Sequence, residues 1–496
     1  MPSLRAATAA AALAVLSGAA GLTHAEPSAT ADNPWKAMAK GDLAFAEAYV
    51  RDQYISIVYP APGPVLARLA AAKAVAEADA EKVDSFGGYN AVLQRFVHAM
   101  DDEHVGIRPY LVQSNLRWPG FLLAYQGRRY ITAAAAAPGA PANGSEVTSC
   151  DGRPMNQWVD ELAMFEGGHR GLESTKARVA NLLLVDKANP FFDLPKHCVI
   201  GNMDTPLAWQ DLPLAKELSA LGDLAVHEHR ETSIAPFGRN SAWVRLGIFQ
   251  TETDAETQQF RDVITRAPSL RSRDVIVLDV RGNGGGPYNW FMAFLRSLYG
   301  DAYADYYARA RVVIEPVYRA TPETRAYLMS DDAPGAGPAI PPDPQTESGP
   351  SAPPFGEALA TAIAHHEPIY KSPHVTPPKP TATPQRLTNA KVYVLTDYGC
   401  GSACIAFADE MRLFPGVTQI GLETFVDNRT GTPLAHPLPS GNGRISVPIL
   451  TRDKRERGDA EPVRPLYEFE GNIADDAAVR DWIIHTVLPR DGVKSF

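Results

Sequence analysis

Two short apolar runs in the second half of the chain each end in a glycine-rich turn. Residues 274–280 read DVIVLDV and break at once into RGNGGG (281–286), and residues 391–396 read KVYVLT before DYGCG. Continuous apolar runs of this length are typical of strands buried on both faces of a parallel sheet. Because ligands bind at the carboxyl ends of such strands, we expect both turns to border one crevice.

The pattern nearer the amino terminus, over residues 33–112, is helical. A first helix is predicted to start at a capping Asp42. A later helix places apolar residues on one face at i, i+3, i+4 and i+7 spacing, and His104 continues this stripe by one turn. The members of the stripe are Tyr89, Val92, Leu93, Phe96, Val97 and Met100. These patterns predict a helical N-terminal domain.

The remaining pattern divides the chain into further parts. Short strands and turns fill residues 115–232, and an α/β core occupies residues 235–490. Within the core, residues 330–388 contain proline-rich stretches that cannot pack as regular structure. This insertion is either a gate over the crevice or an ordinary loop, and the sequence leaves both open.

The first 25 residues have the pattern of a secretory signal peptide. MPSLR is basic, an alanine-rich apolar stretch follows, and THA precedes Glu26 as a small-residue cleavage pattern. We therefore predict an exported protein, periplasmic or secreted. No later segment has the apolar length of a membrane span, so membrane insertion is not expected.

Charge and cysteine content narrow the classes further. The formal net charge of -10 argues against nucleic acid as a partner. In an oxidising compartment the four cysteines allow three pairings, of which we favour Cys150 with Cys198. Cys400 and Cys404 either bond with some strain or stay two small buried thiols, and we favour the thiols.

Ser402 is the candidate nucleophile. It stands at the head of the helical run SACIAFADEMRLF, where backbone N–H groups and the helix dipole face any negative charge that develops beside it. The glycines at 284–286 can turn further N–H groups inward because they lack a Cβ. One turn can thus supply a nucleophile and the other an oxyanion hole.

The strings LDVRGNGGG and VYVLTDYGCGSACIAFADE resemble the serine peptidases of the tail-specific, C-terminal-processing and tricorn group. The resemblance implies a multidomain α/β fold with a crotonase-like core, which the family shares with Clp protease, behind an N-terminal helical cap and a PDZ-like module. It also implies that Ser402 attacks peptide bonds. The oxyanion would be bound by Ala403 and by a glycine of the other turn, Gly284 or Gly285.

The chain departs from this family at the general base. Tail-specific members have a lysine in a stretch like GEPTFGKG, where this chain reads GLETFVDN and has Asp427. A carboxylate with a pKa near about 4 is a poor base for a serine hydroxyl. The string AMDDEHVGIRP resembles the tricorn-like segment that carries a catalytic histidine, which implies that His104 is the base. Alignment on Pro462 puts Glu456 in the place of the glutamate that completes the relay.

The string WPGFLLAYQGRRYITAAAAAPGAPANGSEVTSCDG resembles a PDZ domain. Such domains add an extended chain end to a sheet edge and hold its carboxylate with loop amides. The resemblance implies substrate contacts at Gly120, Phe121 and Leu122. The alternative is that this module is a structural spacer.

Three functional hypotheses follow from these residues. The first is an exported serine endopeptidase that cleaves polypeptide with Ser402, His104 and Glu456 and needs no cofactor or metal. The second is a catalytically inactive relative that binds polypeptide or envelope partners, which the missing lysine suggests. The third is acyl transfer on an ester or thioester, a chemistry that this fold superfamily also hosts.

Overall fold

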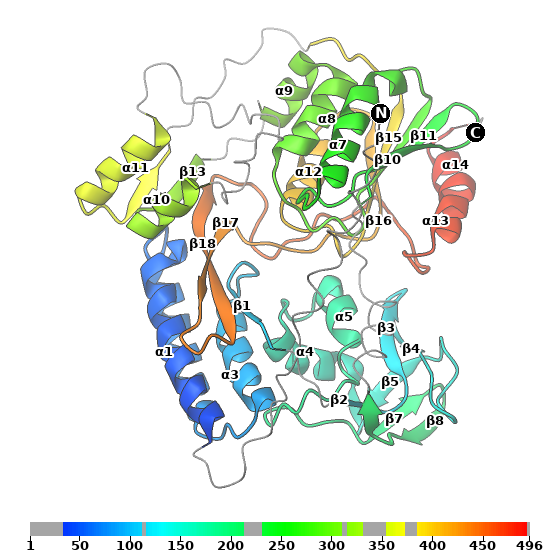
Figure 1. Cartoon of the computed structure of the whole chain (residues 1–496). Helices are drawn as coiled ribbons and strands as arrows, with labels where there is room; N and C mark the ends of the chain where they lie inside the picture. The colour runs from blue at the N-terminus through cyan, green and yellow to red at the C-terminus, as the bar shows by residue number, and fades with distance from the viewer. Residues whose placement is uncertain are drawn as a thin grey trace, which may run out of the picture.

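The computed structural model describes residues 33–111, 116–212, 231–309, 315–330, 354–372 and 384–493. The predicted signal peptide lies outside these ranges, and so do the proline-rich stretches of the insertion. Figure 1 shows the described chain as three regions: a sheet flanked by helices, a helical region with its own sheet, and a smaller region that contains α4 and α5.

A six-stranded sheet forms the centre of the predicted core. Its order is β10-β11-β12-β15-β16-β19, and all neighbours except β10 and β11 run parallel. The strands are β10 (Ser233–Pro236), β11 (Ser241–Arg245), β12 (Val275–Asp279), β15 (Lys391–Thr396), β16 (Val417–Gly421) and β19 (Tyr467–Glu468). The two apolar runs of the sequence, β12 and β15, are direct neighbours, so both glycine turns leave the same edge of the sheet.

Both faces of this sheet are covered, which explains why its strands are apolar throughout. Ile276 and Leu278 point to one face and pack with one set of helices, whereas Val275 and Val277 point to the other. The first face carries α7 (Asp254–Arg266), a 3-10 turn (Ala267–Leu270), α8 (Asn289–Tyr299), α9 (Asp301–Arg309) and α12 (Ala403–Met411). The second carries α13 (Asp476–Trp482), a π-helical turn (Ile483–Val487) and α14 (Leu488–Arg490).

The N-terminal helices do not stand alone but pack on a second sheet built mostly from the carboxyl-terminal half. The order is β1-β18-β13-β14, and β17 also pairs with β18. The helices are α1 (Pro34–Gln53), η1 (Ile55–Ile57), α2 (Pro62–Ala80) and α3 (Phe86–His98). The strands are β1 (Gly106–Pro109), β13 (Glu315–Arg319), β14 (Ile369–Lys371), β17 (Thr430–Pro437) and β18 (Gly443–Asp453), and α10 (Pro322–Leu328) and α11 (Phe355–Ala364) lie beside them.

Two details of the helical region differ from the expectation. Helix α1 begins at Pro34 with Asn33 as its cap, and Asp42 lies inside it. Asp42 is buried there and accepts hydrogen bonds from the hydroxyl groups of Tyr89 and Ser440, each 2.6 Å long. Helix α3 ends at His98, so His104 lies on the following turn and not on the helix. The predicted apolar face of α3 is confirmed, because it is buried against α1 and α2.

The middle region, residues 116–212, contains small antiparallel sheets and two helices. The strands are β2 (Leu116–Trp118), β3 (Leu122–Gln126), β4 (Arg129–Ala133), β5 (Val147–Cys150), β6 (Arg153–Pro154), β7 (His197–Ile200), β8 (Met203–Pro206) and β9 (Gln210–Leu212). The helices are α4 (Met155–Glu166) and α5 (Glu173–Ala180). The predicted disulfide between Cys150 and Cys198 is confirmed and joins β5 to β7. None of the helices within the described ranges has the length and apolarity to cross a membrane.

A buried ion pair fixes the start of the first glycine turn. Arg281 follows β12, is 2% exposed, and donates to Asp279 at 2.9 and 2.8 Å and to Asp476 of α13 at 2.6 Å. Burial alone would raise the pKa of Asp279, but the hydrogen bonds and charge of Arg281 outweigh it and hold that pKa below its ordinary value. Arg281 therefore ties the turn to the helix that covers the sheet.

We expect Arg281→Met to lower the free energy of unfolding by about 3 kcal/mol, because it leaves the buried Asp279 carboxylate without its main partner. Arg128→Met is the matched control: Arg128 pairs with Glu468 on the surface with its side chain 61% exposed, and such pairs contribute below about 1 kcal/mol. Urea unfolding of both variants measures the difference. Equal losses would contradict a structural role for the buried pair.

Candidate active site

Ser402 occupies a strained turn between β15 and α12. Its backbone has φ 48° and ψ -116°, a conformation that residues with a Cβ rarely adopt and that costs about 1–3 kcal/mol. A serine in such a strand-to-helix turn presents its hydroxyl group at the edge of the sheet. The expected position of Ser402, in a turn between a buried strand and a helix, is therefore observed.

The glycine turn packs directly against the serine turn. A Cβ built on Gly285 would lie 2.8 Å from both the Ala403 nitrogen and the Ser402 Cβ, so only glycine allows this approach. The Gly401 N–H donates to the Asn283 carbonyl at 3.0 Å, which fixes the two turns relative to each other. A Cβ built on Gly286, which has φ 129°, would lie 2.2 Å from the Gln250 nitrogen.

Asp397 joins the same two turns from below. Its Oδ1 accepts from the Gly282 N–H at 2.8 Å and from the Gly399 N–H at 3.0 Å. Burial, only partly offset by these two hydrogen bonds, raises the pKa of Asp397 to about 6. The carboxyl group thus connects the two turns of the site, while burial makes its ionised form unfavourable.

The candidate oxyanion donors differ in their availability. The Gly285 N–H is engaged, because it donates to Asn283 Oδ1 at 2.9 Å. The N–H groups of Gly284 and Ala403 have no acceptor among the described residues. The two unengaged groups belong to the two different turns, as an oxyanion hole between them requires.

His104 lies over a fully buried carboxylate. Its Nδ1 is 3.6 Å from Asp102 Oδ1, and its backbone N–H donates to the same oxygen at 3.0 Å. Asp102 Oδ2 accepts from the hydroxyl groups of Tyr54 at 2.7 Å and Thr430 at 2.6 Å. Burial would raise the pKa of Asp102, but His104 and Thr430 lower it further than burial raises it. Asp102 is therefore an anion held in place from three segments of the chain.

One pocket of about 520 Å³ brings the serine and the histidine together. Its walls come from the turn after α3, from α5 and the residue after it, and from the turns at the edge of the six-stranded sheet. The lining residues are Glu103, His104, Arg178, Asn181, Gly282, Gly284, Tyr398, Gly399, Gly401, Ser402, Phe425, Val426 and Asp427. Within the described residues, no group of three or more His, Cys, Asp or Glu side chains is arranged to hold a metal ion.

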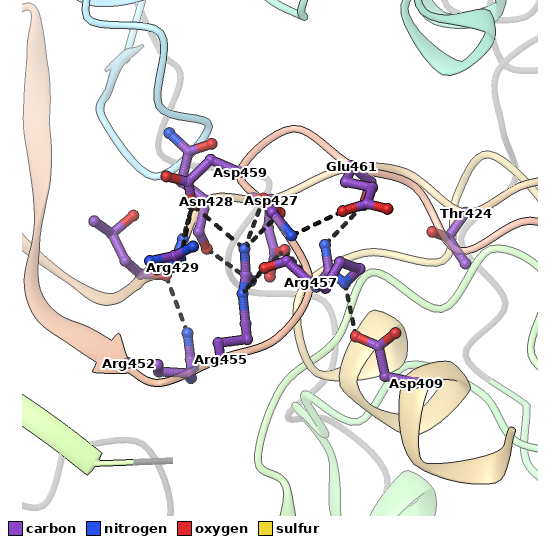
Figure 2. Close-up of polar contacts among 12 residues, drawn as sticks. Asp409, Thr424, Asp427, Asn428, Arg429, Arg452, Arg455, Arg457, Asp459 and Glu461 are labelled. Carbon is purple, nitrogen blue, oxygen red and sulfur yellow. Dashed lines mark hydrogen bonds and ion pairs between the residues drawn. The ribbon is translucent and has the colours of Figure 1, made fainter. Parts of the chain in front are cut away.

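Glu456 is not part of this assembly. Its side chain is exposed, and no described contact joins it to His104 or Ser402. Its neighbours Arg455 and Arg457 turn inward instead, and both donate to Asp427 Oδ1, at 2.8 and 2.7 Å (Figure 2). Sequence spacing alone does not show that the flanking arginines, and not the glutamate, contact the pocket residue Asp427.

Asp427 lines the pocket at the position of the family's lysine. Burial would raise its pKa, but Arg457 and Arg455 outweigh burial and hold the pKa below its ordinary value. Figure 2 shows these arginines converging on Asp427 from the segment that follows β18. Asp427 therefore stays charged and engaged, and it cannot take a proton from Ser402.

The predicted peptide-binding residues Gly120, Phe121 and Leu122 lie elsewhere. None of them lines the pocket, and the side chains of Phe121 and Leu122 are buried. Two residues that the sequence analysis missed do line it from the middle region, Arg178 and Asn181. Asp102 is two residues before His104 in the sequence. We expected the helix to continue to His104, and on a continuous helix the side chain of Asp102 would point away from that of His104.

A serine on a strained turn, a histidine in the same pocket and unengaged N–H groups beside the serine define a serine-type peptidase. Residues 240–456 match the model of peptidase family S41, which supports a place for the chain among the tail-specific serine peptidases. No curated protein matches the sequence.

Solved structures show the same fold over almost the whole chain. The crystal structure of mature CPAF matches with a TM-score of 0.60 and 14% identity, covering 92% of this chain and 99% of that one. Mature CPAF complexed with lactacystin matches with a TM-score of 0.59 and 12% identity, covering 93% of this chain and 98% of that one. At these identities the likeness extends to the fold alone.

We expect Asp397→Asn to stabilise the protein at neutral pH. Because the folded state raises the pKa of Asp397 to about 6, folding is favoured below about pH 4 and loses this contribution as the pH rises through 6. An asparagine keeps an oxygen for Gly282 and Gly399 and cannot ionise, so the gain is about 3 kcal/mol at pH 8.

The measurement is urea unfolding of wild type and variant at pH 4 and pH 8. Asp481→Asn, whose side chain is 73% exposed, controls for the loss of a charge. A gain that is the same at both pH values would show that ionisation of Asp397 is not its origin.

Proposed function

We propose that this protein is an exported serine endopeptidase in which Ser402 attacks the peptide bond and His104 is the general base. The observation that carries the proposal is the pocket itself. Ser402 and His104 belong to different regions of the chain, and both line the pocket beside the turns at the edge of the six-stranded sheet. A buried carboxylate also lies behind the histidine, and unengaged N–H groups lie beside the serine. These two additional features are not expected if the serine and the histidine shared the pocket by chance.

The chemistry follows from the residue types. A serine hydroxyl is weakly nucleophilic at neutral pH until a positioned imidazole, with a pKa near about 6.5, accepts its proton during attack. The His104 Nδ1 faces Asp102, which leaves Nε2 for the serine hydroxyl. The same imidazolium then protonates the leaving amine, and water completes hydrolysis of the acyl-enzyme.

Charge that develops on the carbonyl oxygen is received by backbone amides. The N–H groups of Ala403 and Gly284 are the proposed oxyanion donors, because both lack another acceptor. Gly285 serves a different purpose: its missing Cβ lets the two turns touch, and its N–H is bound to Asn283. Preorganised donors of this kind contribute several kcal/mol to the transition state.

Asp102 is the proposed third member of the relay in place of Glu456. Its distance of 3.6 Å from Nδ1 is longer than a hydrogen bond, but Nδ1 is buried and has no closer acceptor among the described residues. Such contacts commonly shorten when substrate binds. The exposed Glu456 would have to displace Arg455 and Arg457 from Asp427 to reach the same nitrogen.

Substrate capture and location complete the proposal. The residues 115–232 form the proposed PDZ-like module, in which Gly120, Phe121 and Leu122 lead into β3 and receive an extended polypeptide. The leader at residues 1–25 directs the protein to the periplasm or beyond. The helical cap, residues 33–112, donates the base to the core.

We expect a fluorophosphonate probe to label the wild type and not Ser402→Ala, because only the activated hydroxyl reacts with it. His104→Ala should slow labelling by at least about 1,000-fold. Ser269→Ala, in the surface turn after α7, is the matched control and should label as wild type does. Labelling that persists in Ser402→Ala would contradict the assignment of the nucleophile.

The third member of the relay is tested by Asp102→Asn against Glu456→Gln. We expect Asp102→Asn to lower kcat on casein by about 1,000-fold with little change in KM, because the amide cannot stabilise the imidazolium. The hydroxyl groups of Tyr54 and Thr430 can reorient to accept from the amide, so the fold should persist. Glu456→Gln should leave kcat unchanged, and the opposite ranking would restore Glu456 to the relay.

A further inference from the structure

The second disulfide of the structure surrounds the nucleophile. Cys400 and Cys404 are bonded, which corrects the expectation of two free thiols, and Ser402 stands midway between them. We propose that this disulfide is the positioning element for Ser402 and Ala403, so that full peptidase activity requires its oxidised form. The inference rests on the proposed function and adds a control of that same site by thiol chemistry.

Cys400 is fixed at the amino-terminal side of the turn. Its N–H donates to the Asp397 carbonyl and its carbonyl accepts from the Phe425 N–H, both at 3.1 Å. Asp397 follows the last residue of β15, and Phe425 lines the pocket. The first sulfur therefore belongs to a segment that the sheet and the pocket wall already hold.

Cys404 is fixed on the other side, in the first turn of α12. Its side chain is fully buried in the cluster that contains Phe407 and Met411, and its Sγ lies 3.8 Å from the Val280 carbonyl. The second sulfur is thus held by the helix core and by the end of β12. The disulfide joins these two fixed points across the three residues that form the serine turn.

Those three residues need such a restraint because Ser402 has a positive φ. Relaxation to an ordinary negative φ would move both the hydroxyl group and the following N–H of Ala403. The disulfide opposes it, together with backbone hydrogen bonds: the Gly401 N–H donates to the Asn283 carbonyl, the Cys404 N–H to the Gly401 carbonyl, and the Ile405 and Ala406 N–H groups to the Ser402 carbonyl. Without the covalent link, only backbone hydrogen bonds and the close contact with Gly285 hold the reactive geometry, and hydrogen bonds can break and re-form when the turn opens.

The redox step is an exchange with a dithiol. A thiolate of the dithiol attacks one sulfur of the Cys400–Cys404 bond, and its second thiol then releases the other. Two electrons and two protons pass to the protein, which gains two thiols, and the reagent leaves as a cyclic disulfide. Because both sulfurs are buried, exchange follows local opening of the turn. In a thiol-rich compartment this exchange lowers the activity of the peptidase, and oxidation of the two thiols restores it.

The first test compares Cys400→Ala/Cys404→Ala with Cys150→Ala/Cys198→Ala, which removes the other buried disulfide, far along the chain in the middle region. We expect the first pair of substitutions to slow fluorophosphonate labelling by about 100-fold and to lower kcat on casein with little change in KM, as small misplacements of a nucleophile do. The control variant should label at the wild-type rate. Equal labelling of both variants would overturn the proposal.

A second test uses the unmodified chain, in case the variant does not fold. The protein is incubated with increasing dithiothreitol, labelled with the fluorophosphonate, and its thiols are counted by alkylation and mass spectrometry. Labelling should fall in proportion to the reduced fraction of Cys400 and Cys404 and return after reoxidation with glutathione disulfide. Labelling that continues while this bond is reduced would overturn the proposal alone, whereas an oxidised wild type that never labels would overturn the peptidase function itself.

Discussion

The site depends on one backbone constraint, the positive φ of Ser402. A residue with a Cβ stays in that conformation only where its surroundings hold it. Here the surroundings are a turn of glycines close enough to exclude any larger residue, and a covalent link across the serine turn. The same constraint sets the direction of the Ala403 N–H, so the proposed nucleophile and the proposed oxyanion donor are positioned together. The apolar strands β12 and β15 matter chiefly because they place the two turns at one edge.

A second constraint brings the base to that edge. His104 lies between α3 and β1, and β1 pairs with β18 over residues 106–109 and 443–446. The adjacent β17 begins with Thr430, whose hydroxyl group reaches Asp102. The helical region therefore contributes His104, the proposed base, to the pocket that Ser402 lines. Where the sequence resemblance expects a lysine, the pocket wall has the buried Asp427 balanced by arginines, and the proposed proton acceptor comes from another part of the chain.

Much of this arrangement could be predicted from local sequence. The runs around 275 and 391 and the glycine turns predicted the central strands and the contact between the two turns, because strands buried on two faces are apolar and close backbone approach requires glycine. The second sheet could not be predicted, because β1 pairs with β18 across more than three hundred residues and β13 pairs with β18 across more than a hundred. The carboxylates Glu456 and Asp102 could not be ranked from the sequence either. Which of them faces His104 depends on the direction of side chains after a turn, and the spacing of residues along the chain does not predict that direction.

The pairing of β1 with β18 also governs when the protein can first act. The ribosome synthesises β1 long before its partner strand β18. The segment that carries His104 therefore cannot pair with β18 until nearly the entire polypeptide has been synthesised. Tyr54, Asp102 and Thr430 likewise meet only in the finished chain. A form that ends before β18 lacks the strand that pairs with β1, so the proposed relay can be complete only in a chain that contains both strands.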